Sequence, residues 1–193
     1  MILRPTPGPC RVILLGMMGS GKTTLGTRLA ERTGWPYHDN DALVARATGR
    51  TARDLALEST QALRDAEAAS LRLAMREPEP AIVAAAAGVV LDPALRSELR
   101  QAGIVVWLHA PPDVLAERAE RGPHRPWLEG DAAAWIAATS VEREPLYAEV
   151  ADLEVDTDAE PPDRAVDRLV AALEGRGCAR WLGTRAVAAE APS

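Results

Sequence analysis

The sequence has no phenylalanine, and only two cysteines and three histidines occur among its 193 residues. The cysteines, Cys10 and Cys178, lie near opposite ends of the chain and belong to no CxxC motif. The histidines, at positions 38, 109 and 124, are scattered and form no cluster with them. This pattern predicts neither a zinc site nor a disulfide framework. We therefore expect a protein of the reducing cytoplasm.

Positive charge is also in short supply, because 22 basic residues stand against 28 acidic residues and the formal net charge is −6. A nucleic-acid partner would need a net basic surface, so this balance disfavours one. No apolar run is long enough to span a membrane, and prolines in MILRPTPGPC stand where a secretory signal needs an apolar segment. We expect a monomer that acts on a small ligand and has no membrane partner.

Short apolar runs alternate with segments of helical periodicity along the chain. The runs that predict strands are 11–15, 35–38, 81–86, 104–108 and 153–155. Helices are predicted at 22–33, from 51, at 60–76, 93–102, 112–121, 131–143 and around 166–173. This alternation predicts an α/β fold, a parallel sheet with helices on both faces. We expect one domain over residues 1–174, with a leader at 1–10, and a poorly ordered tail at 175–193 in which Trp181 is a candidate contact with the body.

A phosphate-binding motif follows the first predicted strand. Residues 16–23, GMMGSGKT, satisfy G-x-x-x-x-G-K-[ST] directly before a predicted helix. Its glycines let backbone N–H groups surround phosphate oxygens, and the helix N-terminus adds positive potential. Lys22 is predicted to hold the β- and γ-phosphates of ATP, and Thr23 to ligate Mg²⁺. The predicted ATP-binding set from this motif is Gly19, Ser20, Gly21, Lys22, Thr23 and Thr24. The other interpretation is a glycine-rich turn with a solvated lysine.

Two carboxylates, Asp39 and Asp41, follow the second predicted strand. At the carboxyl end of a parallel strand, residues i and i+2 can point into the crevice where ligands of such sheets bind. One carboxylate would serve a metal ion and the other a substrate. The alternative is a helix cap, which is a common use of aspartate.

Residues 14–49, LLGMMGSGKTTLGTRLAERTGWPYHDNDALVARATG, resemble the opening of shikimate kinases. Downstream, 63–67 (LRDAE) is similar to the family's Phe-Arg-x-x-Glu, 125–128 (RPWL) to its Arg-Pro-Leu-Leu lid, and 143–147 (REPLY) to its Arg-x-Pro-Leu-Tyr. The resemblance covers roughly residues 11–174. It implies a P-loop NTPase fold with three layers, a five-stranded parallel sheet and a mobile lid at about 122–130. It also implies ATP- and Mg²⁺-dependent phosphorylation of shikimate, in aromatic amino-acid biosynthesis.

The resemblance gives roles to the residues that carry it. Asp39 would help to place Mg²⁺ through water, and Asp41 would hold the hydroxyl group that attacks the γ-phosphate. Arg64 and Arg143 would grip the carboxylate of the substrate through forked, charge-assisted hydrogen bonds. Glu67, at i+3 from Arg64, would keep that arginine aimed. Without the resemblance, Arg64 and Glu67 are equally consistent with an exposed ion pair on a helix.

Two further arginines are assigned to the nucleotide by the same resemblance. Arg125 lies in the predicted lid, RGPHRPWLEG, whose closure would exclude water and bring its charge to the γ-phosphate. It is thus a predicted catalytic residue, with Lys22 and Asp41, and a predicted ATP ligand. Arg118 occupies the position at which the family packs an arginine against adenine. Both side chains have the alternative of being solvated surface charges.

The stretch AIVAAAAGVV, residues 81–90, departs from the family. The family has a Gly-Gly-Gly turn against the substrate ring, and the matching residues are Ala86, Ala87 and Gly88, of which Ala87 and Gly88 are predicted substrate contacts. Alanines there either strain the backbone, if the turn needs φ > 0, or narrow the pocket. Leu63 also replaces the family's phenylalanine. Three functions therefore stay open: a shikimate 3-kinase, a paralogue for another hydroxy acid or cyclitol, and a nucleotide-binding interaction protein.

Overall fold

The structure is a computed structural model that describes residues 10–121, 131–178 and 182. The predicted lid at 122–130, with Arg125, lies outside the described residues, as do residues 1–9 of the predicted leader and Trp181. No helix among the described residues is long and apolar enough to cross a membrane.

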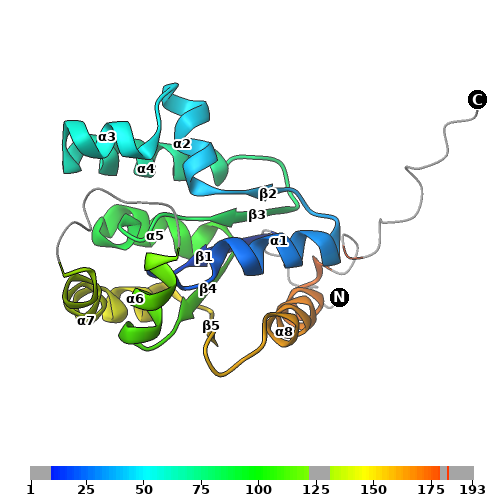
Figure 1. The fold of residues 1–193 in the computed structure, drawn as a ribbon. Helices are drawn as coiled ribbons and strands as arrows, with labels where there is room; N and C mark the ends of the chain where they lie inside the picture. Colours follow the sequence, from blue (N-terminus) through cyan, green and yellow to red (C-terminus); the bar gives the residue numbers. More distant parts are fainter. Residues whose placement is uncertain (1–9, 122–130, 179–181, 183–193) are drawn as a thin grey trace, which may run out of the picture.

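A parallel sheet of five strands forms the centre of the described structure (Figure 1). Its strands are β1 (Arg11–Leu15), β2 (Tyr37–His38), β3 (Ala81–Ala84), β4 (Ile104–His109) and β5 (Leu153–Asp156), in the order β2-β3-β1-β4-β5. Every neighbouring pair is parallel. The predicted α/β fold with a five-stranded parallel sheet is confirmed. Two strands are shorter than predicted, since β2 begins at Tyr37 and β3 ends at Ala84.

Helices connect these strands and cover both faces of the sheet. They are α1 (Lys22–Thr33), α2 (Asn40–Thr48), α3 (Ala52–Glu58), α4 (Thr60–Ala74), α5 (Pro93–Ala102), α6 (Pro112–Glu120), α7 (Ala132–Val150) and α8 (Pro162–Gly175), with a short 3₁₀ turn, η1, at Val89–Leu91. Some begin at caps that the sequence predicts: the Thr51–Asp54 capping box opens α3, and Asp92 caps α5. Helices α2 and α3 stand with α4 beyond the β2 edge of the sheet (Figure 1).

Alternate residues of β1 divide the core into two layers. Val12 and Leu14 contact the helices α1 and α8, whereas Ile13 and Leu15 face the layer that includes α5 and α7. All five residues of β1 are buried, and the four that follow Arg11 are apolar, as expected for a strand covered on both faces. The phosphate-binding motif therefore leaves the sheet at its centre, where residues from both layers converge.

Helix α7 is longer than predicted. It runs to Val150, through Pro145, whereas the sequence predicted an end near Arg143. Proline removes one backbone donor and normally ends a helix. Here Ile136 and Thr139 are buried before the proline, and Tyr147 and Val150 after it, so packing of one helix face continues across it. The extension beyond Arg143 is about two turns long and places Tyr147 in the core.

The prediction that Cys10 and Cys178 belong to no disulfide framework is wrong, which also removes the reason given for a reducing cytoplasm. The two residues are joined by a disulfide, and both are fully buried beside the start of β1 and the end of α8. A spacing of 168 residues gives no local signal of this contact. Leu182 also packs against this layer. Part of the segment predicted as a tail therefore belongs to the core.

Candidate active site

The phosphate-binding loop between β1 and α1 depends on its glycines. Gly16, Gly19 and Gly21 have φ values of 138°, 75° and 87°, which L-residues rarely adopt. A Cβ atom on Gly16 would lie 2.2 Å from the carbonyl oxygen of Leu108, and one on Gly19 would lie 2.5 Å from that of Leu115. The loop thus packs directly against the backbone of β4 and α6, and no larger residue fits either position.

Lys22, the first residue of α1, reaches back over this loop. Its Nζ donates hydrogen bonds to the carbonyl oxygens of Gly16, at 2.7 Å, and Met17, at 2.9 Å. The ammonium group is therefore held at the N-terminal end of a helix, where the backbone potential is also positive. This combination suits an anion as highly charged as a triphosphate.

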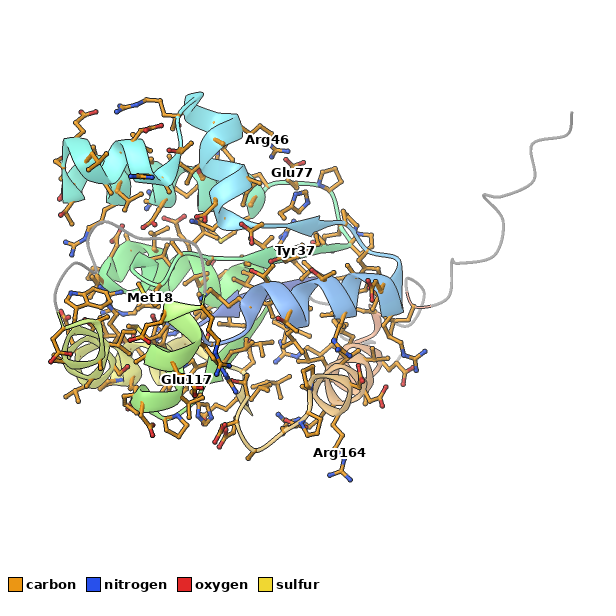
Figure 2. All side chains as sticks on the ribbon, in the orientation of Figure 1. Met18, Tyr37, Arg46, Glu77, Glu117 and Arg164 are labelled. Carbon is orange, nitrogen blue, oxygen red and sulfur yellow. A yellow bond between two sulfur atoms is a disulfide. The ribbon has the colours of Figure 1, made fainter. Side chains whose placement is uncertain are left out.

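Asp39 is the helix cap that its sequence position allowed, and its second carboxylate oxygen contacts Thr23 of the phosphate-binding motif. One carboxylate oxygen, Oδ1, caps α2 by accepting a hydrogen bond from the backbone N–H of Asp41 at 3.0 Å. The other oxygen, Oδ2, accepts hydrogen bonds from Thr23 Oγ1 at 3.4 Å and from Tyr37 Oη at 3.1 Å. Tyr37 lies between β2 and α1 (Figure 2), and burial, assisted by Asp39, raises its pKa, so the phenol remains a donor.

The Thr23 and Asp39 oxygens form a donor set that fits Mg²⁺. The ion prefers oxygen ligands and keeps several waters, so one hydroxyl and one carboxylate beside a phosphate site suffice. No group of three or more His, Cys, Asp and Glu side chains within the described ranges could hold a metal by itself. The site thus suits a magnesium ion that arrives with a nucleotide.

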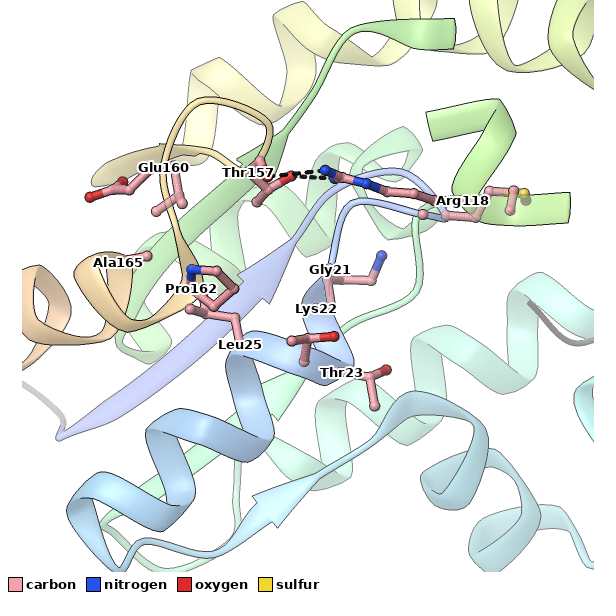
Figure 3. Close-up of a pocket in the computed structure, with 14 residues that line it drawn as sticks. Gly21, Lys22, Thr23, Leu25, Arg118, Thr157, Glu160, Pro162 and Ala165 are labelled. Carbon is pink, nitrogen blue, oxygen red and sulfur yellow. Dashed lines mark hydrogen bonds between the residues drawn. The ribbon is translucent and has the colours of Figure 1, made fainter. Parts of the chain in front are cut away.

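A cavity of about 550 Å³ opens on one side of the phosphate-binding loop (Figure 3). Its lining includes Gly19, Gly21, Lys22, Thr23 and Thr24 of the predicted ATP-binding set. Apolar side chains of Leu25, Val155, Pro162 and Ala165 complete the wall, as expected for a site that takes a flat, partly apolar base.

Arg118 of α6 lies on the wall of this cavity. Its Nη1 donates a hydrogen bond to Thr157 Oγ1 at 3.0 Å and its Nη2 donates one to the carbonyl oxygen of Thr157 at 3.1 Å (Figure 3). Asp158 lies 3.6 Å from Nη2. These contacts hold the guanidinium plane at the edge of the cavity, so Arg118 is a fixed wall rather than a freely solvated charge.

A second cavity, of about 690 Å³, lies on the other side of Lys22 and Thr23. Met18, Lys22 and Thr23 line both cavities, so the two spaces meet at the phosphate-binding loop. The second cavity brings together the residues that sequence reasoning assigned to the acceptor and the metal: Asp39, Asp41, Arg64, Glu67, Ala87, Gly88 and Arg143. They come from α2, α4, α7 and the turn after β3.

The guanidinium groups of Arg64 and Arg143 in the acceptor cavity form no ion pairs with the described part of the chain. Neither Arg64 nor Arg143 has an Asp or Glu oxygen within 4.0 Å among the described residues. The Nε atom of Arg143 is buried without a hydrogen-bond partner there. The buried Nε of Arg143 favours an anionic ligand such as a carboxylate, and Arg64, which is exposed, lines the same cavity. Among the described residues, the structure shows neither the ion-pair alternative for Arg64 and Glu67 nor the predicted contact by which Glu67 would aim Arg64.

The turn after β3 settles what the alanines do. No described residue other than glycine has positive φ, and Gly88 itself has a φ of −85°. Ala86 and Ala87 are therefore unstrained, and the alternative in which they cost conformational energy is wrong. Both line the acceptor cavity, so their methyl groups narrow it.

Sequence reasoning missed several residues of the acceptor cavity, among them Thr60, Trp135, Thr139 and Glu142. Trp135 and Thr139 precede Arg143 by eight and four residues on α7, so helical periodicity could have placed them on its face. The guanidinium carbon of Arg143 lies 6.0 Å from the centre of the Trp135 ring, within reach of a cation–π interaction.

Comparisons with known proteins agree with this geometry. The shikimate kinase family model matches residues 18–174. The shikimate kinase of Symbiobacterium thermophilum is 38% identical over 170 residues, which cover 86% of this chain and 97% of that protein. That of Nitratidesulfovibrio vulgaris is 44% identical over 147 residues, covering 74% and 83%. The structure of the Acinetobacter baumannii shikimate kinase in complex with shikimate superimposes with a TM-score of 0.78 at 28% identity, covering 87% of this chain and 94% of that one.

Proposed function

Because this chain belongs to the shikimate kinase family, we propose that it transfers the γ-phosphoryl group of ATP to a hydroxyl group of shikimate, giving shikimate 3-phosphate. One observation carries the proposal: a nucleotide cavity and an acceptor cavity meet at Lys22 and Thr23. A phosphoryl group bound at that junction faces both spaces. Direct transfer between two bound substrates needs this arrangement.

The phosphate-binding loop and Lys22 hold the β- and γ-phosphates. Their N–H groups and the ammonium group place positive potential where charge accumulates during transfer. Thr23, directly, and Asp39, through water, would hold Mg²⁺, whose charge neutralises the phosphate oxygens. Arg118 borders the base, and Arg125 of the predicted lid adds a charge near the γ-phosphate.

Asp41 orients the attacking hydroxyl group and accepts its proton late in the transfer, since a loose transition state needs little base strength early. Arg64 and Arg143 approach the carboxylate of shikimate from α4 and α7. Ala87 and Gly88 form the wall beside its ring. Because the described residues of one chain line both cavities, we propose that the enzyme acts as a monomer, without nucleic acid, in the cytoplasm where ATP is supplied.

A second candidate acceptor follows from the narrowed wall. The methyl groups of Ala86 and Ala87, with Leu63 in place of an aromatic ring, change the shape of the acceptor cavity but leave its two arginines in place. A different hydroxylated carboxylic acid or a cyclitol would fit such a change.

The test is a coupled assay of ADP release with shikimate and a panel of sugar acids, cyclitols and nucleosides. We expect saturable turnover that is highest on shikimate, and a loss of at least about a thousandfold in kcat for Lys22→Met, which removes the ammonium group but keeps the chain length. Turnover on another panel member but not on shikimate would favour the second candidate. Comparable kcat values for wild type and Lys22→Met would show that Lys22 does not bind the transferred phosphate.

A further inference from the structure

The hydroxyl group of Tyr147 occupies the junction of three parts of the site. Tyr147 lies on α7 with no exposed surface, and its hydroxyl group donates a hydrogen bond of 2.7 Å to the carbonyl oxygen of Ala87. The same oxygen lies 3.7 Å from the Sδ atom of Met17. Ala87 belongs to the acceptor wall and Met17 to the phosphate-binding loop. One phenol thus contacts both substrate-binding regions from a third element.

The geometry makes the Ala87 carbonyl group the acceptor of this hydrogen bond. A phenol has one proton to donate, and the bond to Ala87 is short and directed to a stronger acceptor than a thioether sulfur. The ring is fixed by the Trp107 ring, stacked against it at a centroid distance of 6.0 Å and an angle of 26°. Burial raises the pKa of Tyr147, so the phenol stays protonated and its O–H group can donate the hydrogen bond.

Tyr147 also stands one helical turn beyond Arg143, the predicted carboxylate ligand. Residues i and i+4 lie on the same face of a helix, so any shift of Tyr147 along the wall moves Arg143 with it. Met17, on the other side of the hydroxyl group, accepts a hydrogen bond from Lys22 through its carbonyl oxygen at 2.9 Å. Tyr147 therefore contacts the acceptor wall and the phosphate-binding loop, and it shares a helix face with the predicted carboxylate ligand Arg143.

We propose that Tyr147 is a positioning residue that sets the acceptor cavity: its hydroxyl group fixes the Ala87 wall relative to Arg143 and the phosphate-binding loop. This inference rests on the proposed function for the identity of the acceptor. The hydrogen bond between Tyr147 and Ala87 is present in the protein without substrate, so this part of the inference does not depend on the proposed function.

Tyr147→Phe is the test variant, because it keeps the buried ring and removes only the hydroxyl group. Thr33→Val is the matched control. Thr33 is also buried, and its hydroxyl group donates to the carbonyl oxygen of Leu29 at 2.7 Å, at the far end of α1 from the phosphate-binding loop. Both variants lose one buried hydroxyl-to-carbonyl hydrogen bond, and Thr33→Val also removes the hydroxyl oxygen that accepts a hydrogen bond from the backbone N–H of Trp35 at 3.2 Å. A general loss of stability therefore affects the control at least as much as the test variant.

In steady-state kinetics with shikimate, we expect Tyr147→Phe to raise the KM for shikimate about tenfold while the KM for ATP stays within about twofold. The glycines of the phosphate-binding loop hold its shape without the phenol, which is why the nucleotide side is spared. Thr33→Val should leave both KM values unchanged. A KM for shikimate within twofold of wild type, or an equal rise in both KM values, would overturn the proposal.

Amide hydrogen exchange of the substrate-free protein supplies a second measurement that needs no acceptor. Peptides covering residues 85–91 should exchange at least about fivefold faster in Tyr147→Phe than in wild type, and at the wild-type rate in Thr33→Val. Unchanged exchange in Tyr147→Phe would overturn the structural link. If the wild type fails to turn over shikimate, the proposed function fails, and the exchange result still decides the role of Tyr147.

Discussion

Backbone groups shape the nucleotide side of the cleft, whereas side chains shape the acceptor side. Around the phosphate-binding loop, the chain adopts left-handed conformations against the carbonyl groups of β4 and α6, and glycine is required at Gly16 and Gly19. Around the acceptor, Ala86 and Ala87 stand where the resemblance predicts glycines, and neither residue has a positive φ. Lys22 lines both sides, but only the acceptor side accepts residues larger than glycine.

This difference predicts where a substitution can occur without loss of the fold. A substitution in the loop costs conformational energy and collides with backbone, so it damages the fold itself. A substitution in the wall changes cavity volume by a methyl group and leaves the fold intact. Acceptor choice can therefore change while phosphoryl transfer is preserved.

The largest effect is expected from Gly16→Ala, which challenges the backbone side. A Cβ atom 2.2 Å from the Leu108 oxygen, at a φ of 138°, must displace β1 or β4. We expect a loss of about 3 kcal/mol in the free energy of unfolding, measured by urea titration, and no detectable ATP binding. Gly49→Ala is the control, since Gly49 has a φ of 69° but no atom within 4 Å of its Cβ position. Equal losses in the two variants would show that overlap with Leu108 does not matter.

Asp41→Asn is expected to have the next largest effect, because it removes the proposed proton acceptor, which lines the acceptor cavity together with Lys22 and Thr23. The value of kcat should fall about a hundredfold to ten-thousandfold, with little change in the KM for ATP. Asp163→Asn, which changes a carboxylate on α8 paired with Arg28, should keep full activity. Wild-type kcat in Asp41→Asn would remove Asp41 from the mechanism.

Arg143→Ala tests whether a side chain of the acceptor cavity holds the substrate carboxylate. Loss of a guanidinium ligand should raise the KM for shikimate about tenfold to a hundredfold and lower kcat much less, because a charged hydrogen bond is lost in ground state and transition state alike. Arg53→Ala, on α3 and outside the lining of both cavities, is the control for removal of positive charge. A fall in kcat at constant KM would contradict a role in holding the carboxylate.

The smallest effect is expected from Ala87→Gly, which widens the wall. If the methyl group narrows the cavity, its removal should lower the KM for shikimate about twofold to tenfold. Glycine should at the same time lower the stability by about 0.5–1 kcal/mol, because the unfolded chain gains freedom. Thermal unfolding and kinetics together check these opposite signs. A raised KM would mean that the methyl group contacts the substrate favourably.

The sheet and the phosphate-binding loop could be predicted from sequence because their signals are local. Unbroken apolar runs identified the strands, and the spacing of Gly16, Gly21 and Lys22 identified the loop. The length of α7 could not be predicted in this way. Pro145 is a local stop signal, and only the burial of Tyr147 and Val150 beyond it overrides that signal.

Some residues of the acceptor cavity have a local sequence signal and others do not. Asp41, Arg64 and Arg143 were found through short motifs, whereas Trp135 and Thr139 belong to no motif and could have been found only from their helical spacing to Arg143 on α7. The hydrogen bond from Tyr147 to Ala87 spans 60 residues and depends on how a helix lies against a strand end. Such contacts depend on tertiary packing, which periodicity alone does not specify.

The bond between Cys10 and Cys178 turns most of the chain into a closed covalent ring that contains all five strands. Hydrolysis of any one peptide bond between these residues opens the ring without separating it into pieces. An oxidised sample nicked once by a protease would gain only the mass of one water molecule, and two fragments would separate only after a thiol reductant is added.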